Sequence, residues 1–215
     1  MSLPRESDPR TPIGMDSRAR RLADLLVAGP AALLLAPVLL AIALVVRASS
    51  AGPALFRQVR VGRGGRHFAI WKFRTMVVDA ARQGPAVSGR ADPRVTRVGR
   101  WLRATRLDEL PQLMNLIRGD MTLIGPRPEV PRFLPYYTAA ERALLDVRPG
   151  VIGPGAVLFA GEQSGELDGV EDADAFYVHH HLHPKLALDR AYLRDRRFGQ
   201  DLRLIWAALS SVTRR

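Results

Sequence analysis

The sequence predicts a mixed α/β, helix-rich fold in which one N-terminal membrane helix is joined to a small cytosolic domain. Leu25 to Val46 form a run of 22 residues without a charged side chain, and about 20 apolar residues are enough for a membrane helix. The rest of the chain alternates short extended stretches with segments of helical periodicity, which is typical of a small mixed domain. We therefore divide the chain into a disordered lead (1–16), a membrane helix (17–48) and a cytosolic domain (49–215).

The apolar segment carries two features that a straight membrane span does not need. Pro30 and Pro37 lie inside it, and an interior proline removes a backbone hydrogen bond and bends a helix. Both flanks are basic, with Arg18, Arg20 and Arg21 before the segment and Arg47, Arg57, Arg60, Arg63 and Arg66 after it. Because basic residues favour the cytoplasmic side, we predict a re-entrant helix that breaks near Pro37 and returns. A straight span and a buried core helix are the alternatives.

Charge and composition limit the classes of partner. The 215 residues carry a formal net charge of +11 and no cysteine, which excludes disulfides, thiol nucleophiles and cysteine-bound metals and favours an anionic partner. Nucleic acid is disfavoured because aromatic residues make up only 7% and no DNA- or RNA-binding signature is visible. Of the 32 cationic side chains, only Lys72 and Lys185 are lysines. Unless chance retained them, each occupies a place that suits a compact ammonium.

Two strands are predicted after the membrane segment. The stretches ALFRQVRVG (54–62) and RHFAIWKFRTM (66–76) have the composition of strands, and Arg63-Gly64-Gly65 between them is typical of a hairpin turn. Alternation along the second strand places Lys72 and Arg74 on the same face. We therefore expect two cations to lie together there.

An acidic pair lies at an expected helix start within residues 97–118, a segment with helical periodicity that Gly119 is expected to cap. Pro111 is tolerated only in the first turn of a helix, so Asp108 or a neighbour becomes the N-cap and Glu109 lies in the first turn. Ionised carboxylates near cations can act as a nucleophile or as metal ligands. Plain helix capping is the structural alternative.

Arginines flank this acidic pair in the sequence. Arg100, Arg103 and Arg106 have the spacing of one helical face, which would contact either substrate or lipid headgroups. Arg127 stands between Pro126 and Pro128, where the stiff backbone aims its guanidinium in advance. This arrangement suits bidentate binding of phosphate, and a rigid turn with a solvated arginine is the alternative.

The C-terminal half is predicted to contain further helices, at residues 139–147, 171–183 and 185–212, with Pro184 separating the last two. Asp172-Ala173-Asp174 matches a DxD metal motif, but we interpret it as an acidic helix start. The run from His179 to His183 lacks a second cluster that would complete a tetrahedral metal site. We interpret this run as an interfacial or surface feature.

Several motifs occur together in a specific order: Ala36-Pro37 in the apolar segment, FRQVRVGRGGRHFAIWKFRTM, LDELPQLMNLIRGDMTLIGPRPEVP, RPGVIGPG and HPKLALDRAYL. From about Arg21 to its C-terminus the chain thereby resembles the bacterial sugar transferases, the monotopic polyprenyl-phosphate phosphoglycosyl transferases that start glycan assembly. One departure is that many relatives carry TGWAQV after RPG, where this chain has VIGPGAVLFAGEQ. The sugar preference of those relatives is therefore not transferred to this chain.

The resemblance implies an enzyme that moves a phospho-sugar from a UDP-sugar to polyprenyl (undecaprenyl) phosphate and releases UMP, the first membrane step of polysaccharide synthesis. Asp108 matches the nucleophile that forms a covalent phospho-sugar intermediate, and Glu109 matches a residue that helps to hold Mg²⁺. Both are expected in the catalytic site. The expected substrate-binding residues are Lys72, Arg74, Arg103, Arg127 and Arg148.

The resemblance also implies a location at the bacterial inner membrane, with the catalytic domain facing the cytoplasm. Arg-rich amphipathic helices are expected to dock this domain on membrane lipids, and a homo-oligomer is compatible with the sequence. The alternative function is a non-enzymatic, basic, membrane-associated protein that binds anionic lipid or nucleic acid, which charge alone would allow. An acidic pair on a surface that binds polyanions argues against this alternative.

Overall fold

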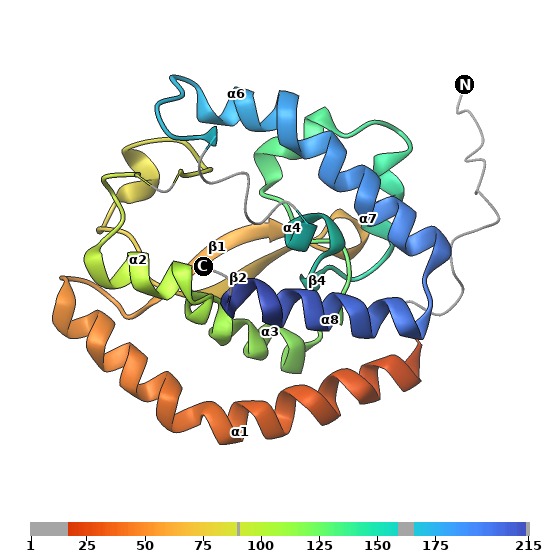
Figure 1. The fold of residues 1–215 in the computed structure, drawn as a ribbon, viewed down its shortest axis with the longest axis horizontal. Helices are drawn as coiled ribbons and strands as arrows, with labels where there is room; N and C mark the ends of the chain where they lie inside the picture. The colour runs from red at the N-terminus through yellow and green to blue at the C-terminus, as the bar shows by residue number, and fades with distance from the viewer. Residues whose placement is uncertain (1–16, 90, 159–165, 214–215) are drawn as a thin grey trace.

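The computed structural model describes residues 17–89, 91–158 and 166–213 (Figure 1). Within them lie an antiparallel hairpin of β1 and β2, a parallel pair of β3 and β4, and many helices. In chain order the elements are α1 (Arg18–Ser49), β1 (Leu55–Val61), η1 (Arg63–Gly65), β2 (His67–Phe73), η2 (Ala80–Arg82), α2 (Arg97–Ala104), η3 (Leu107–Gln112), α3 (Leu113–Arg118), β3 (Thr122–Ile124), η4 (Pro131–Tyr136), η5 (Glu141–Asp146), β4 (Gly150–Ile152), α4 (Pro154–Leu158), α6 (Ala173–Tyr177), η6 (Val178–Leu182), α7 (His183–Asp195) and α8 (Phe198–Thr213). The mixed, helix-rich class is confirmed, and the predicted disordered lead (1–16) lies outside the described residues.

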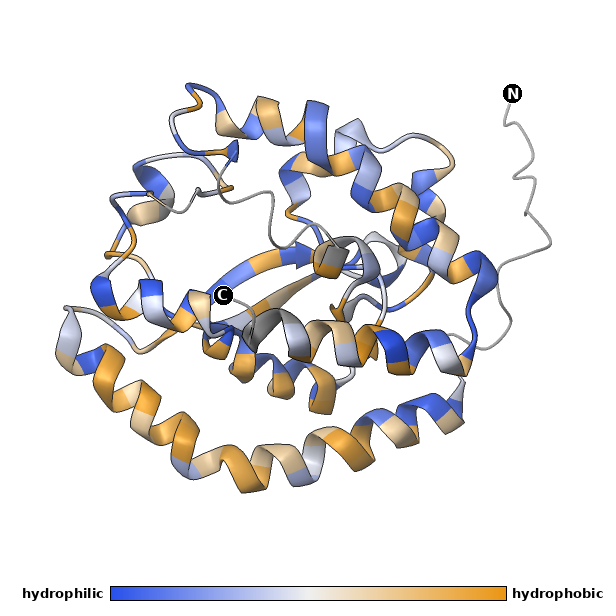
Figure 2. Ribbon diagram, viewed as in Figure 1, coloured by the Kyte–Doolittle hydropathy of each residue, from blue (hydrophilic) through white to orange (hydrophobic). Residues whose placement is uncertain are grey.

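Helix α1 is one uninterrupted helix of 32 residues that contains both Pro30 and Pro37. The break expected near Pro37 does not occur, and Figure 1 instead shows α1 as an arc whose two ends turn toward the rest of the molecule. Each proline removes one backbone hydrogen bond, which a long helix absorbs as a bend. The arc is mainly hydrophobic (Figure 2), and Leu33 and Leu34, between the prolines, are each 79% exposed. Among the described residues, α1 is the one helix long and apolar enough to cross a membrane.

The N-terminal end of α1 is fixed by two charged side chains. The buried carboxylate of Asp24 accepts hydrogen bonds from the Thr122 hydroxyl at 2.9 Å and from the Leu123 backbone N–H at 3.0 Å. One turn earlier, Arg21 donates to the carbonyl of Ile117 at 2.6 Å, at the end of α3. Because a buried charge is tolerated only when it is paired or hydrogen-bonded, these contacts specify how α1 docks on β3 and α3.

The C-terminal end of α1 is fixed by Arg74, which follows β2. Its guanidinium donates to the carbonyl of Ser50 at 2.8 Å, to that of Val46 at 3.3 Å, and to that of Ala51. The last carbonyls of a helix have no intrahelical partner, so Arg74 satisfies groups that α1 leaves open. The N-terminal end of α1 is thus attached to β3 and α3, and its C-terminal end is attached to the residue that follows β2. The middle of the arc projects away from these elements.

The predicted hairpin is confirmed. Strands β1 and β2 pair antiparallel, with Phe56 opposite Lys72 and Arg57 opposite Trp71. The connection contains Gly64 and Gly65 with φ angles of 65° and 74°, in the left-handed region that glycine adopts at little cost. The sequence Arg-Gly-Gly therefore determined where the hairpin turns.

The segment 97–118 is not one helix. It consists of α2, the 3-10 helix η3 and α3, because Arg106 adopts a left-handed conformation with φ of 59°. This conformation is unfavourable for a residue with a Cβ atom, and it redirects the chain between α2 and η3. Arg106 is consequently outside the face shared by Arg100 and Arg103, contrary to the prediction. Gly119 ends α3 with φ of 86°, as expected of a C-capping glycine.

The C-terminal helices differ from the prediction in where they are divided. Pro184 lies in the first turn of α7, where its missing N–H has no intrahelical partner, and the division falls instead between α7 and α8. The histidine run forms the π-helical turn η6. His179 and His180 are exposed as predicted, but His181 is buried, which corrects the interpretation of the whole run as a surface feature.

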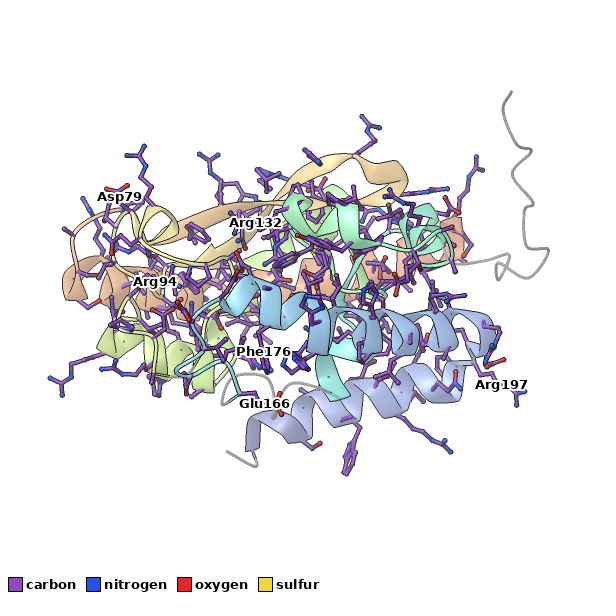
Figure 3. The ribbon with its side chains drawn as sticks, turned by 90° about the horizontal axis from the view of Figure 1, so that it is seen from above. Asp79, Arg94, Arg132, Glu166, Phe176 and Arg197 are labelled. Atoms are coloured by element: carbon purple, nitrogen blue, oxygen red, sulfur yellow. The ribbon has the colours of Figure 1, made fainter. Side chains whose placement is uncertain are left out.

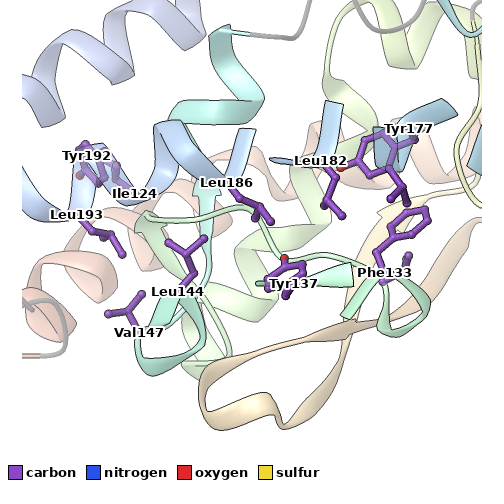
Figure 4. Close-up of a cluster of buried hydrophobic side chains, with 12 residues drawn as sticks. Ile124, Phe133, Tyr137, Leu144, Val147, Tyr177, Leu182, Leu186, Tyr192 and Leu193 are labelled. Atoms are coloured by element: carbon purple, nitrogen blue, oxygen red, sulfur yellow. The ribbon is translucent and has the colours of Figure 1, made fainter. Parts of the chain in front are cut away.

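A hydrophobic core lies where η4, η5 and α7 meet (Figure 4). Leu182 and Leu186 on η6 and α7 face Tyr137 and Leu144 across this core, and fully burying one such leucine contributes roughly 1.5–3 kcal/mol. Two smaller clusters receive α1, with Ala28 in one and Ile42 and Val46 in the other. The core under α7 therefore holds the C-terminal helices, while α1 packs on separate clusters near each of its ends.

Candidate active site

The acidic pair lies in η3, the short 3-10 helix that joins α2 to α3. Asp108 and Glu109 occupy its first turn and Pro111 lies within it. Arg106 stands at the capping position and its side chain makes no capping hydrogen bond. Plain capping therefore does not explain Asp108, which lies inside the turn and is 7% exposed.

The side chain of Asn115 aligns this turn with β2. Its Oδ1 accepts from the Trp71 backbone N–H at 3.0 Å, and its Nδ2 donates to the Ala69 carbonyl at 2.8 Å. Asn115 is fully buried and satisfies backbone groups of β2 that would otherwise be unpaired. The contact brings the start of α3 beside Lys72, the next residue of the strand.

Glu109 is the centre of a partly buried ion-pair network. The Lys72 ammonium lies 2.9 Å from its Oε1, and the guanidinium of Arg127 contacts both carboxylate oxygens, at 3.1 Å for Oε2. Burial by itself would raise the pKa of Glu109, but Arg127 and Lys72 together hold it well below its usual range. Such forked contacts are the strong form of a charge-assisted hydrogen bond. The stiff Pro-Arg-Pro backbone thus aims Arg127, as the sequence predicted, with a carboxylate as its present partner.

Asp108 has a different environment although it is the neighbour of Glu109. Burial raises the pKa of Asp108, while the charges of Lys72, Arg103 and Arg127 oppose that rise. Among the described side chains and backbone groups, none donates a hydrogen bond to its carboxylate. Asp108 is therefore a carboxylate that cations surround without binding it, which leaves its oxygens available for a reaction.

Arg103, on the last turn of α2, approaches this site from the other side. Its Nε donates to the Thr75 hydroxyl at 2.9 Å and its Nη1 to the Ser88 hydroxyl at 2.9 Å. Burial lowers the pKa of Arg103, and Asp108 is the largest influence that opposes this lowering. The structure therefore brings Lys72, Arg103 and Arg127 around the acidic pair.

Of the other two predicted substrate-binding residues, Arg74 points away from this site, while the backbone of Arg148 lies beside the loop that carries Arg127. Arg74 is occupied by the backbone carbonyls at the end of α1, because the strand ends at Phe73 and its alternation does not continue to Arg74. Arg148 precedes β4, and its carbonyl lies beside Gly125, where an added Cβ would approach it to 3.0 Å. The backbone of Arg148 thereby packs against the loop that carries Arg127.

The loop that carries Arg127 is held at several backbone groups. The carbonyl of Pro126 accepts from the Gly150 N–H at 2.8 Å, and that of Pro128 accepts from the Arg60 guanidinium at 2.9 Å. Neither proline can donate a backbone hydrogen bond, so these acceptors are what the loop offers on either side of Arg127. The parallel pairing of β3 and β4 and the arginine of β1 together fix the position of Arg127.

Sequence reasoning missed three ionisable groups behind this loop, of which Asp189 is buried and the other two are partly buried. Lys185 and Asp189 lie on α7, and Glu129 follows Pro128 and accepts a hydrogen bond from the Tyr177 hydroxyl. Burial is the main cause of a lowered pKa of about 8 at Lys185 and a raised pKa of about 7 at Asp189. The signal that could have identified them was present, because Lys185 is the second of only two lysines and both α7 residues lie in the motif HPKLALDRAYL.

The acidic pair fits a Mg²⁺ ion that substrate phosphates help to hold. Mg²⁺ is usually bound through one or two carboxylates together with phosphate oxygens and water. Asp108 and Glu109 supply two adjacent carboxylates, of which Glu109 already accepts bonds from Lys72 and Arg127. Among the described residues, no group of three or more acidic, histidine or cysteine side chains gathers as a preformed metal site.

The DxD motif is structural. Asp172 caps α6 by accepting from the Ala175 N–H at 2.9 Å, as the interpretation of an acidic helix start predicts. Asp174 pairs with Arg132, which is labelled in Figure 3, and accepts from the Ala86 N–H at 3.0 Å. These contacts attach the 83–89 segment to α6.

The comparisons with known proteins agree with this arrangement. Residues 15–215 match the family model described as bacterial sugar transferase. A UDP-glucose:undecaprenyl-phosphate glucose-1-phosphate transferase of Caulobacter vibrioides is 38% identical over 97% of this chain and 74% of that protein. The exopolysaccharide production protein ExoY of Rhizobium meliloti is 39% identical over 70% of this chain and 73% of its own length.

Other relatives are longer than this chain. An Escherichia coli UDP-glucose:undecaprenyl-phosphate glucose-1-phosphate transferase is 35% identical over 91% of this chain, which spans 40% of that protein. The match therefore covers nearly all of the chain and includes both α1 and the acidic turn. On this evidence the chain belongs to the bacterial sugar transferase family.

Proposed function

We propose that the protein transfers a sugar phosphate from a UDP-sugar to polyprenyl phosphate, with Asp108 as the nucleophile. An oxygen of the Asp108 carboxylate attacks the β-phosphorus of the UDP-sugar. The bond from that phosphorus to the bridging oxygen breaks, and UMP leaves with the electron pair. The acceptor phosphate then attacks the same phosphorus and breaks its bond to Asp108, which restores the carboxylate.

The observation that carries this proposal is the contrast between two adjacent carboxylates. Glu109 is bound by Lys72 and Arg127, whereas Asp108 is buried among the same cations without a hydrogen-bond donor. Phosphoryl transfer depends mainly on positioning and charge neutralisation. Lys72, Arg103 and Arg127 provide three positive charges for a diphosphate substrate, and Glu109 keeps two of them in place until the substrate arrives.

The acceptor step needs little proton transfer, because a lipid phosphate is already anionic. Mg²⁺, held by Glu109 and the diphosphate, would neutralise further negative charge on the transferred group. The residues of this chain have the remaining tasks of binding the diphosphate and of keeping the Asp108 oxygens free of other partners.

We also propose that α1 enters the cytoplasmic leaflet of the bacterial inner membrane and returns. Its 32 residues would span about 48 Å if straight, so each half of the arc is about 24 Å long and shorter than a hydrocarbon core of roughly 30 Å. Asp24 and Arg74 attach the two halves to the same domain, and the most exposed leucines lie between the prolines. These contacts support a re-entrant position with the catalytic domain in the cytoplasm.

Helix α8 supplies a second exposed apolar surface that membrane lipids could cover. Its exposed side chains include Phe198, Leu202, Trp206 and Leu209, which follow helical spacing along one stripe. An aromatic and aliphatic stripe of this kind suits the headgroup boundary of a bilayer.

A homo-oligomer stays a prediction.

The test is a search for UMP release and for the covalent intermediate. The purified protein is incubated with Mg²⁺, undecaprenyl phosphate and a panel that includes UDP-glucose and UDP-N-acetylgalactosamine, and UMP is measured. In parallel, the acceptor is omitted and the intact protein mass is recorded. We expect a mass increase of one sugar phosphate, located at Asp108 by peptide mapping.

The matched variants are Asp108→Asn and Asp146→Asn, the second of which changes an exposed acid. Asp108→Asn is expected to remain folded and to lose both turnover and the adduct, while Asp146→Asn retains them. Turnover near the wild-type rate in Asp108→Asn would refute the nucleophile. No UMP from any UDP-sugar would instead favour a non-enzymatic, lipid-binding protein.

A further inference from the structure

The guanidinium of Arg103 has two hydroxyl groups as its side-chain partners. Its Nε donates to the Thr75 hydroxyl and its Nη1 to the Ser88 hydroxyl, each at 2.9 Å. Both acceptors are neutral, and Arg103 forms no ion pair within the part of the chain that the structure describes. The two hydroxyls therefore fix the guanidinium without neutralising the charge that an anionic substrate requires.

The backbone of Arg103 leads directly into the acidic turn. The Arg106 N–H donates to the Arg103 carbonyl at 3.2 Å, and the Glu109 N–H donates to the Arg106 carbonyl at 3.2 Å. On the other side of the turn, Lys72 contacts Glu109 at 2.9 Å, and Thr75 follows Lys72 by three residues. The Arg103 side chain therefore joins the segment that carries Lys72 to the helix that precedes the acidic pair.

Ser88 lies in the connection between β2 and α2, and the chain just before it is bound to α6. The carboxylate of Asp174 accepts from the Ala86 N–H at 3.0 Å and from the Val87 N–H at 3.3 Å. The same carboxylate pairs with Arg132. The second acid of the DxD sequence therefore fixes the backbone one and two residues ahead of Ser88.

The chain just after Ser88 is bound by a different acid, Asp168, which precedes α6. Its Oδ1 accepts from the Ala91 N–H at 2.9 Å. A Cβ atom at Gly89 would lie 2.0 Å from that oxygen and 3.1 Å from the Asp168 backbone nitrogen, so the chain approaches as closely as a glycine allows. Ser88 is therefore fixed on both sides, although it belongs to no helix or strand.

We propose that Ser88 is a positioning residue for Arg103: its hydroxyl fixes the guanidinium beside the acidic turn, ready to bind the diphosphate of the UDP-sugar. This inference rests on the proposed function, because that function gives Arg103 a diphosphate to bind. Ser88 acts through Arg103 and needs no contact with the substrate. Because the chain on either side of Ser88 is already held, little conformational entropy is lost when the hydroxyl binds Arg103.

A pair of substitutions at Ser88 tests the need for the hydroxyl. Ser88→Ala removes the acceptor of the Arg103 Nη1, and we expect kcat/KM for the UDP-sugar, measured by UMP release, to fall about 10-fold. Ser88→Thr keeps a hydroxyl that accepts the same bond and should stay within about threefold of the wild type. Equal losses in the two variants would overturn the proposal, because a role in packing alone does not distinguish alanine from threonine in this way.

A double-mutant cycle tests whether the effect passes through Arg103. In an Arg103→Met background, Ser88→Ala should cost less than about twofold in kcat/KM, because the guanidinium that Ser88 positions is already gone. Ser210→Ala is the matched control, since it removes a hydroxyl that donates to the Ala207 carbonyl at 3.0 Å on α8, and it should leave kcat/KM unchanged. Additive effects of Ser88→Ala and Arg103→Met would show that Ser88 does not act through Arg103.

The same four proteins test the contact without substrate. Urea midpoints are measured in detergent for the wild type, Ser88→Ala, Arg103→Met and the double variant. We expect the midpoint shift of the double variant to be smaller than the sum of the two single shifts, as for residues in direct contact. Additive shifts would overturn the proposal whatever the activity. Non-additive shifts without wild-type turnover on any UDP-sugar would overturn only the proposed function.

Discussion

Two buried aspartates each accept a backbone N–H from a distant segment of the chain, and they serve different parts of the molecule. Asp24 of α1 accepts from Thr122 and from the Leu123 N–H, at the start of β3. Asp189 of α7 accepts from the N–H of Gly155 at 2.9 Å, in the first turn of α4. Two residues before Gly155, a Cβ atom at Gly153 would lie 3.0 Å from the Arg127 backbone nitrogen.

The difference lies in what each contact positions. The Asp24 contact joins an exposed apolar helix to the domain, so its loss should change stability and the attachment of α1. The Asp189 contact holds the start of α4, and the preceding Gly153 packs against the backbone of Arg127, so its loss should change the reaction. Similar hydrogen bonds can therefore have different consequences, because the segments that they join have different tasks.

The largest loss of activity is expected from a change at Arg127 itself. Arg127→Lys keeps the positive charge but replaces the two-pronged contact with Glu109 by a single ammonium. We expect kcat/KM for the UDP-sugar to fall on the order of 100-fold, measured by UMP release. Arg132→Lys, at an exposed ion pair, is the control and should change it less than about twofold. Wild-type kinetics in Arg127→Lys would show that the fork has no role.

Gly155→Ala should sharpen the comparison, because it disturbs the contact of Asp189 and leaves that of Asp24 intact. The new Cβ would meet backbone atoms of Lys185 at 2.6 and 3.0 Å, so the turn must shift and weaken its bond to Asp189. We expect kcat/KM to fall about 10-fold and stability by roughly 1–3 kcal/mol. Gly199→Ala, which has nothing within 4 Å of its added Cβ, should leave both unchanged. An active, equally stable Gly155→Ala protein would contradict the close packing.

Asp24→Ala removes the contact that joins α1 to β3. It leaves the Thr122 hydroxyl and the Leu123 N–H buried without an acceptor, which costs about 1–3 kcal/mol. Denaturant unfolding in detergent should show this loss, and Asp24→Asn should lose less because it keeps one acceptor oxygen. The value of kcat/KM for the folded protein should change less than about threefold. A catalytic loss as large as that expected of Gly155→Ala would remove the distinction between the two aspartates.

The smallest effect is a difference in pH dependence. Because burial raises the pKa of Asp189 from 3.8 to about 7, the folded protein keeps a proton that the unfolded chain loses between these values. Stability contributed by this proton is present at low pH and is lost as the pH rises from about 4 to 7. Between pH 5 and 7, the free energy of unfolding of the wild type should fall relative to Asp189→Asn by up to about 1.4 kcal/mol per pH unit.

The same pH series distinguishes the contribution of Asp189 to stability from that of the charged groups around it. Lys185 has a lowered pKa of about 8, so its contribution changes above that pH and with the opposite slope. Glu129 and the backbone of Arg127 are common to both proteins. Parallel curves for wild type and Asp189→Asn between pH 5 and 7 would show that Asp189 is ionised throughout this range.

The sequence predicted the hairpin and the turn before α3 because both depend on local chemistry. Glycines fixed the hairpin, and Pro111 marked the acidic turn. The prediction for Arg74 was wrong because alternation describes a strand only while the strand continues, and β2 ends at Phe73. The division at Pro184 was wrong because a proline is equally compatible with a gap between helices and with a first turn.

The sequence by itself determined the apolar helix, the acidic pair and the stiff arginine between prolines, since each of these follows from neighbouring residues. Only the tertiary structure decided which carboxylate the cations bind and which they leave free. It also decided that Asp24 accepts from the Leu123 N–H and Asp189 from the Gly155 N–H. These contacts join residues that are 34 and 99 positions apart, and local propensity carries no information about which distant backbone N–H a buried carboxylate will accept.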